Sequence, residues 1–134
     1  MLKTDKPVCL ITGLGDGTGG FTARRFAKAG YRIAMIARTR ERLIKFEKEL
    51  LGSKGYVCDV SDLTVLENTC KKIKDEMGAP EVLIHNAVKG NFEYLLNGKP
   101  EWLEKNFRIN TTSLMYLAHF LIPEMLYNKK GVII

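Results

Sequence analysis

The stretch VCLITGLGDGTGG, residues 8–20, indicates the fold of this chain because it joins a short apolar run to five glycines within eight residues. Glycine tolerates positive φ angles and lacks a Cβ, so consecutive backbone N–H groups in such a turn can converge on an anion. The helical pattern that follows adds unpaired N–H groups and the positive end of a helix dipole. A strand, a glycine-rich turn and a helix in this order predict a phosphate site in a dinucleotide-binding βαβ unit.

Two glycine spacings overlap in this loop. Residues 15–20 satisfy the general pattern G-x-G-x-x-G, whereas residues 12–19 read T-G-x-x-x-G-x-G. Because the apolar run ends at Thr12, the turn should begin at Gly13, which favours the second spacing. The alternative interpretation is a flexible glycine-rich connection without a ligand, but the strand and helix patterns on both sides favour a phosphate loop.

The rest of the chain alternates apolar runs of strand length with helical patterns. Strands are expected over residues 8–12, 32–37, 56–59, 82–85 and 132–134. Helices are expected over residues 19–29 and 41–51, and from an N-cap at Ser61 or Asp62 to Met77. A further single helix is expected from Pro100 to about residue 127, preceded by a loop or short helix over 91–100. This order predicts an α/β fold, a Rossmann-type doubly wound parallel sheet truncated after the fifth strand. Right-handed crossovers give the strand order 3-2-1-4, with the fifth strand beside the fourth.

Composition limits the remaining possibilities. At 134 residues and 46% hydrophobic, the chain is expected to form one NAD(P)-binding domain over 1–134, the N-terminal portion of a longer single-domain enzyme. No apolar stretch suggests a membrane span or a secretion signal. Cys9, Cys58 and Cys70 are scattered and favour buried thiols in the cytoplasm. The net charge of +6 is mixed with acids over several helices, which is typical of solvated faces and does not suggest a nucleic-acid partner.

The end of the second strand indicates which cofactor binds. An NAD-binding unit usually places an acid there to accept from the ribose hydroxyls, but this chain has Ala37, followed by Arg38 and Thr39. The Arg38 guanidinium can pair bidentately with a phosphate, so NADP is preferred over NAD; the alternative is that Arg38 only faces solvent. Asp16 in the glycine loop would repel a 2′-phosphate unless Arg38 or Arg40 compensates its charge.

Several motifs together resemble the short-chain dehydrogenase/reductase family. Residues 12–19 are similar to its cofactor loop, and Asp59-Val60 to its D-V pair after the third strand. Residues 85–88, His-Asn-Ala-Val, keep only the central Asn-Ala of its N-N-A-G, and Asn110 occupies the position of the helix asparagine in its proton relay. The resemblance implies an oxidoreductase that transfers hydride between NADP(H) and a small carbonyl or alcohol substrate.

The predicted site follows from these motifs. Asn110 is the candidate catalytic residue, and no metal site is expected. The candidate cofactor-binding residues are Gly13, Asp16, Gly17, Thr18, Gly19, Arg38, Thr39, Asp59, Val60, Asn86, Ala87 and Val88. His85 is expected to be a hydrogen-bonded histidine at a strand end without chemistry, and His119 to pack within an apolar stretch of helix.

The catalytic half of the family pattern is missing from this sequence. The family uses a tyrosine with a lysine four residues later, together with a serine, and none of the five tyrosines here has such a lysine. We therefore expect this chain alone to be inactive. Apolar side chains on the fourth helix are expected to be exposed, so that the chain forms homo-oligomers or is marginally stable. The alternative is a non-catalytic nucleotide-binding module from a truncated gene. A methyltransferase is a weaker alternative, because the acid that it usually has after the second strand is absent.

Overall fold

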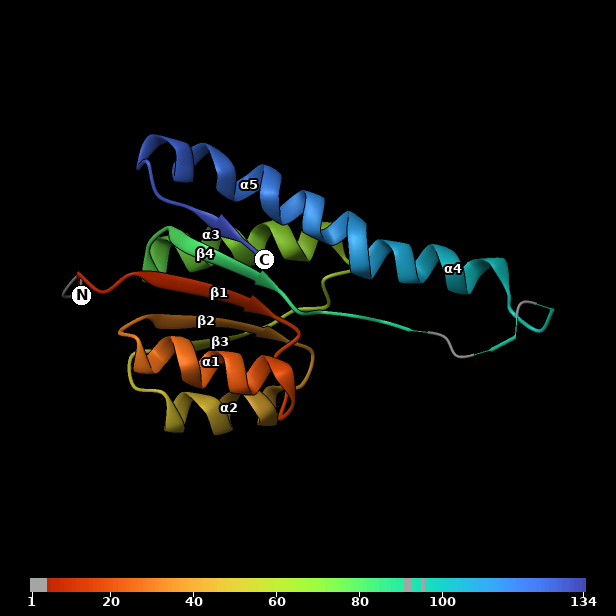
Figure 1. Cartoon of the computed structure of the whole chain (residues 1–134), viewed down its shortest axis with the longest axis horizontal. Coiled ribbons are helices and arrows are strands. Elements are labelled where there is room, and N and C mark those ends of the chain that lie inside the picture. Colours follow the sequence, from red (N-terminus) through yellow and green to blue (C-terminus); the bar gives the residue numbers. More distant parts are fainter. Residues whose placement is uncertain (1–4, 91–92, 95) are drawn as a thin grey trace.

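The computed structural model describes residues 5–90, 93–94 and 96–134, and it shows one parallel sheet with helices on both faces (Figure 1). The strands of the described residues are β1 (Val8–Thr12), β2 (Arg32–Ala37), β3 (Lys54–Val57), β4 (Pro80–His85) and β5 (Val132–Ile133). The helices are α1 (Thr18–Lys28), α2 (Arg40–Glu49), α3 (Leu63–Met77), α4 (Pro100–Phe107) and α5 (Ser113–Tyr127), with the π-helical segment η1 (Arg108–Thr112) between the last two. The strand order β3-β2-β1-β4-β5 confirms the predicted Rossmann-type topology.

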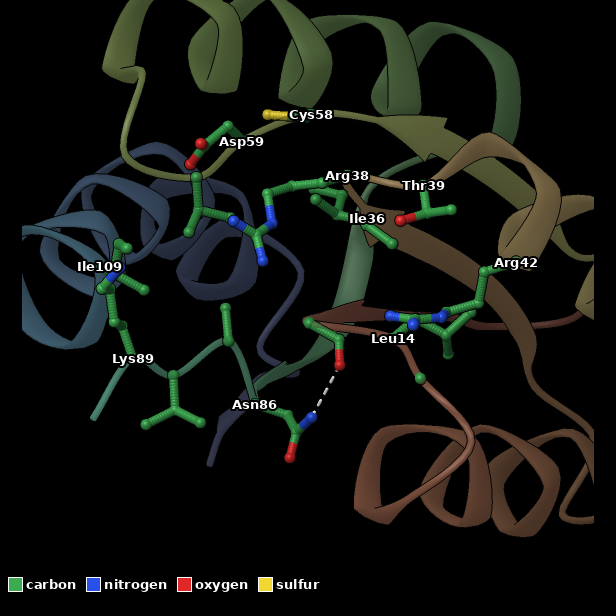
Figure 2. A pocket seen from close by; sticks show the side chains of 16 residues that line it. Leu14, Ile36, Arg38, Thr39, Arg42, Cys58, Asp59, Asn86, Lys89 and Ile109 are labelled. Atoms are coloured by element: carbon green, nitrogen blue, oxygen red, sulfur yellow. Dashed lines mark hydrogen bonds between the residues drawn. The ribbon is translucent and has the colours of Figure 1, made fainter. Parts of the chain in front are cut away.

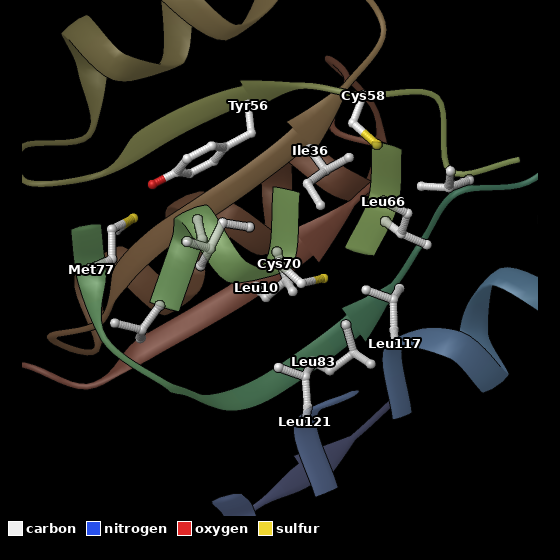
Figure 3. Packing of buried hydrophobic residues seen from close by; sticks show 14 of the residues in the cluster. Leu10, Ile36, Tyr56, Cys58, Leu66, Cys70, Met77, Leu83, Leu117 and Leu121 are labelled. Carbon is white, nitrogen blue, oxygen red and sulfur yellow. The ribbon is translucent and has the colours of Figure 1, made fainter. Parts of the chain in front are cut away.

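β1 is the centre of the sheet and is buried on both faces. Val8 and Leu10 belong to the core cluster under α3 and α5, which Figure 3 shows from close by. Cys9 and Ile11 belong to the cluster under α1 and α2 on the opposite face. Successive side chains of a strand point to opposite faces, so a continuous apolar run is what a strand covered on both sides requires.

The ends of the helices follow the expected local signals. The Asp62 carboxylate accepts a hydrogen bond from the N–H of Val65 at 3.0 Å and caps α3, as predicted. Gly30 and Gly78 follow their helices with φ angles of 95° and 96°, which a residue with a Cβ rarely adopts. The third strand ends earlier than predicted, because Val57 is the last residue with a sheet partner in the register, opposite Ala37.

The single helix predicted from Pro100 onward is wrong in detail. η1 interrupts it, so α4 and α5 are separate helices joined by a π-helical turn. No residue of α4 is buried, and Figure 1 shows α4 projecting beyond the sheet.

His119, which was expected to pack, is exposed on α5, so that prediction is also wrong. No helix in the described part of the chain combines the length and the apolar character needed to cross a membrane.

The parallel register brings the carboxyl ends of three strands together. Thr12 lies opposite Ile36 of β2 on one side and opposite His85 of β4 on the other. In a doubly wound sheet, ligands bind where neighbouring connections diverge at these carboxyl ends.

The predicted loop over residues 91–100 contains a turn in which the carbonyl of Tyr94 accepts the N–H groups of Asn97 and Gly98. Residues 91, 92 and 95 lie outside the described part.

Candidate cofactor-binding site

A cavity of about 420 Å³ opens at the carboxyl ends of β1, β2 and β4 (Figure 2). Its walls come from the glycine loop, the start of α2, the segment after β3 and the segment after β4. The lining residues are Gly13, Leu14, Gly15, Ile36, Ala37, Arg38, Thr39, Arg42, Cys58, Asp59, Val60, Asn86, Ala87, Val88, Lys89 and Ile109.

The glycine loop is fixed against the segment that follows β4. The Asn86 side-chain amide donates to the carbonyl of Gly13 at 2.9 Å, which Figure 2 marks with a dashed line. Gly13 has a φ of 69°, and a Cβ there would lie 2.5 Å from the Cα of Ala87, closer than real Cβ atoms approach. Only glycine therefore fits this position, both for its conformation and for the contact.

The loop leaves the N-terminus of α1 open. Gly17 is the N-cap of α1, and no side chain caps this helix. A Cβ added at Gly17 would have no other atom within 4 Å, so the space beside Gly17 is open. The first turn of α1 contains no acid. The N–H groups of this turn and the positive end of the helix dipole can accommodate an anion.

Two arginines bring positive charge to the cavity. Arg38 follows β2 directly, and Arg42 lies in the first turn of α2. Figure 2 shows both guanidinium groups pointing into the cavity, Arg38 on the side of Asp59 and Arg42 on the side of Leu14. Neither guanidinium forms an ion pair or a hydrogen bond within residues 5–90, 93–94 and 96–134, so both are available to a ligand.

Asp59 presents a charged carboxylate on the wall that follows β3. Its Oδ1 accepts hydrogen bonds from the Ser61 hydroxyl at 2.7 Å and the Ser61 N–H at 2.9 Å. These bonds, with smaller contributions from the charges of Arg38 and Lys105, lower the pKa of Asp59. Among the described residues, Oδ2 makes no hydrogen bond, so one oxygen remains an acceptor for a donor in the cavity.

Asp16 lies outside the cavity lining and is paired elsewhere. Lys45 Nζ donates to its Oδ1 at 2.7 Å, and this contact lowers the pKa of Asp16. The charge that was expected to need compensation from Arg38 or Arg40 is therefore neutralised by a lysine on α2.

His85 connects β1, β4 and η1 through a partly buried network. Thr12 Oγ1 accepts the N–H of Ala87 at 3.2 Å and lies 2.9 Å from His85 Nδ1, while His85 Nε2 lies 3.1 Å from the carbonyl of Ile109. Because a carbonyl only accepts, Nε2 carries the proton, and the Thr12 hydroxyl donates to Nδ1. The Ser113 hydroxyl donates to the same carbonyl at 2.6 Å. Burial lowers the pKa of His85, which favours this neutral tautomer.

Asn110 holds the backbone that leaves β4. Its Oδ1 accepts the N–H of Lys89 at 2.8 Å, and its Nδ2 donates to the carbonyl of Lys89 at 2.9 Å. Asn110 lies in the middle of η1, and π-helical turns are frequent at functional sites. The structure thus brings Asn110 beside the cavity wall, with its amide engaged by main chain.

Eight of the predicted cofactor residues line the cavity, namely Gly13, Arg38, Thr39, Asp59, Val60, Asn86, Ala87 and Val88. Gly17, Thr18 and Gly19 lie at the start of α1 beside it without lining it, and Asp16 is turned to α2. Sequence reasoning missed Arg42, because its helix is rich in mixed charges and resembles a solvated face. A signal was present, since a side chain in the first turn of a helix tilts toward the N-terminus of that helix.

Comparison with known proteins agrees with this fold. The family model described as short chain dehydrogenase matches residues 7–134. The chain is 28% identical over 130 residues to Short-chain dehydrogenase/reductase 3 of Bos taurus, covering 93% of this chain and 43% of that protein. It is 33% identical over 136 residues to the granaticin polyketide synthase putative ketoacyl reductase 1 of Streptomyces violaceoruber, covering 96% of this chain and 50% of that protein.

Solved structures show the same arrangement. A metagenomic short-chain oxidoreductase in complex with NADP matches with a TM-score of 0.89 and 26% identity, covering 95% of this chain and 60% of that chain. The protein therefore belongs to the short-chain dehydrogenase family. It spans about half the length of the curated relatives named above.

The hydrogen bonds of His85 predict its protonation state. The Nε2–H tautomer should persist at neutral pH, and His85 should take up a proton only below the ordinary histidine pKa of 6.5. The unfolded chain binds that proton first as pH falls, so the stability contributed by this site is complete above about pH 6.5 and is lost below it. Nitrogen-15 NMR of the imidazoles measures both properties, and His119→Gln assigns the signals because the chain has two histidines. An Nδ1–H tautomer, or protonation of His85 at or above pH 6.5, would contradict the network.

Proposed function

We propose that this chain is the NADP(H)-binding part of an oxidoreductase that transfers hydride between NADP(H) and a small carbonyl or alcohol substrate. The cavity wall formed by Ala37, Arg38 and Thr39 supports this function, because the second strand ends there without an acid and an unpaired guanidinium points inward. An acid there would accept from a free ribose 2′-hydroxyl, whereas a guanidinium pairs with a 2′-phosphate.

Three features in and beside the cavity suit a dinucleotide. The open N-terminus of α1 at Gly17 would hold the pyrophosphate, because its N–H groups and dipole favour an anion. The free Oδ2 of Asp59 would accept from the adenine amino group, as the family resemblance implies. Arg38 and Thr39 would hold the 2′-phosphate.

The residues after β4 would hold the nicotinamide end. When bound, the cofactor supplies or accepts the hydride. Asn86 fixes the glycine loop, and Asn110 fixes the Lys89 backbone, so both amides set the shape of this end of the cavity. In the family pattern, Asn110 also contributes to a proton relay, and we assign it that role in the whole protein.

The cofactor preference is measurable on the chain itself. NADPH should bind more tightly than NADH, and Arg38→Ala should remove about ten- to a hundredfold of NADPH affinity, the range for a charge-assisted hydrogen bond. Calorimetric titration of both cofactors measures this difference. Arg25→Ala removes the same charge from an exposed position on α1 and serves as the control. Equal affinities in the wild type, or an unchanged preference in Arg38→Ala, would refute the NADP assignment.

We expect the 134-residue chain to bind NADPH without oxidising it. None of its tyrosines has a lysine four residues later to lower its pKa, and loss of a general acid typically slows a reaction about 10²- to 10⁴-fold. NADPH absorbance in the presence of a panel of ketones and aldehydes measures the rate. Ketone-dependent oxidation that Asn110→Ala abolishes would instead assign catalysis to this chain.

We also assign the protein to the cytoplasm and expect it to form homo-oligomers. The buried free thiols suit a reducing compartment. Leu103 and Phe107, four residues apart on α4, are 71% and 60% exposed, and exposed apolar side chains that lie close together favour association. Sedimentation velocity should therefore show species larger than the monomer. A compact monomer with a cooperative thermal transition would contradict this expectation.

A further inference from the structure

The hydrogen bond between Thr12 and His85 lies next to the junction that shapes the cavity. The two residues stand opposite each other in the parallel register, and the residues that follow them, Gly13 and Asn86, line the cavity. Thr12 Oγ1 accepts the N–H of Ala87 at 3.2 Å, and the backbone of Ala87 occupies the space where a Cβ of Gly13 would lie. The Thr12 hydroxyl thus holds one wall of the cavity, and the proton that it donates to His85 Nδ1 sets its orientation.

A second proton on the His85 ring would disrupt this arrangement. Nδ1 would become a donor, so Thr12 Oγ1 would face two donors, Nδ1–H and the N–H of Ala87. The hydrogen of the Thr12 hydroxyl would then lose its acceptor. Thr12 is 0% exposed, and its hydroxyl has no other hydrogen-bond partner among the described residues. Because a buried donor without an acceptor is costly, a protonated ring favours separation of Ala87 from Thr12.

The surroundings of His85 offer nothing to offset a positive charge. The groups that face the ring are the Thr12 hydroxyl from β1, the Ile109 carbonyl from η1 and the Ser113 hydroxyl from α5. Within the described residues, no charged side chain contributes to the pKa of His85, which burial lowers. From the side of β5, the main chain of Ile134 accepts the His85 N–H at 2.8 Å. An α-carboxylate on this last residue would titrate at about pH 3.5, well below the histidine range.

We infer that His85 is a positioning residue for the cofactor, and that cofactor binding requires the neutral, Nε2-protonated form of its ring. The inference rests on the proposed function, because it concerns the shape of the same cavity. The neutral ring orients Thr12, Thr12 holds Ala87, and Ala87 sets the spacing to Gly13. A chain with a protonated His85 must release the Nδ1 proton to the solvent in order to bind, so cofactor binding is coupled to pH. Asparagine, which the family pattern has at this position, does not titrate and lacks this coupling.

The pH dependence of NADPH binding tests the coupling. The 2′-phosphate of NADPH itself titrates at about pH 6, so the comparison is made between variants with the same ligand. His85→Asn keeps an acceptor in place of Nδ1, His85→Gln keeps a donor in place of Nε2, and neither side chain titrates. Between about pH 7.5 and about pH 5, the affinity of the wild type should fall about three- to tenfold further than that of either variant. His119→Gln removes the other histidine, which is exposed on α5, and should retain the wild-type dependence.

Nitrogen-15 NMR of the imidazoles gives a second readout on the wild type. Saturating NADPH should lower the pKa of His85 below its value in the free chain, because the complex favours the neutral ring. A His85 pKa that NADPH leaves unchanged would overturn the inference. The same holds for a pH dependence that is equal in the wild type and the His85 variants.

Two controls separate the possible failures. Circular dichroism at about pH 5 shows which proteins are folded, and if one His85 variant does not fold, the other variant and the NMR titration of the wild type decide. If the wild type binds NADPH at about pH 7.5 but shows no coupling, His85 has no positioning role and the proposed function stands. If the wild type binds no NADPH at that pH, the proposed function fails and this inference fails with it.

Discussion

The close approach of the glycine loop to the segment after β4 is the constraint on which the site depends. Gly13 adopts a positive φ, its missing Cβ leaves room for the backbone of Ala87, and its carbonyl accepts the amide of Asn86. This contact joins the ends of β1 and β4, and it leaves the N-terminus of α1 facing the cavity. A larger residue at Gly13 would separate the two walls, and the cavity would lose its shape before any ligand contact was changed.

A second set of contacts joins this junction to the helices above the sheet. Thr12, His85 and the carbonyl of Ile109 form a chain of hydrogen bonds from β1 through β4 to η1. Asn110, the next residue of η1, holds the backbone of Lys89. The π-helical turn is therefore tied to the end of β4 through His85 and to the segment after β4 through Lys89. Where the family pattern has an asparagine, this chain has His85, whose two ring nitrogens bridge a hydroxyl and a carbonyl.

The sequence predicted the fold well because local signals and topology agreed. The strand order follows from the glycine turn, the alternation of strand-like and helical hydrophobic patterns, and right-handed crossovers. Asp62 marks a helix start because its carboxylate can cap N–H groups, and Gly30 marks a helix end because it tolerates a positive φ. The interruption at η1 could not be predicted, since its residues continue a helical pattern and tertiary contacts decide the extra residue in the turn. The partners of charged residues were also beyond the sequence. Lys45 rather than Arg38 or Arg40 pairs with Asp16, because the partner depends on where α2 lies against the loop.

Binding of a dinucleotide across the carboxyl ends of β1, β2 and β4, as we propose, can be mapped by the change in backbone amide NMR shifts of the chain on titration with NADPH. The largest changes are expected in residues 13–19, 38–42, 59–60 and 86–89. Changes concentrated between α3 and α5, or none at saturating NADPH, would contradict it.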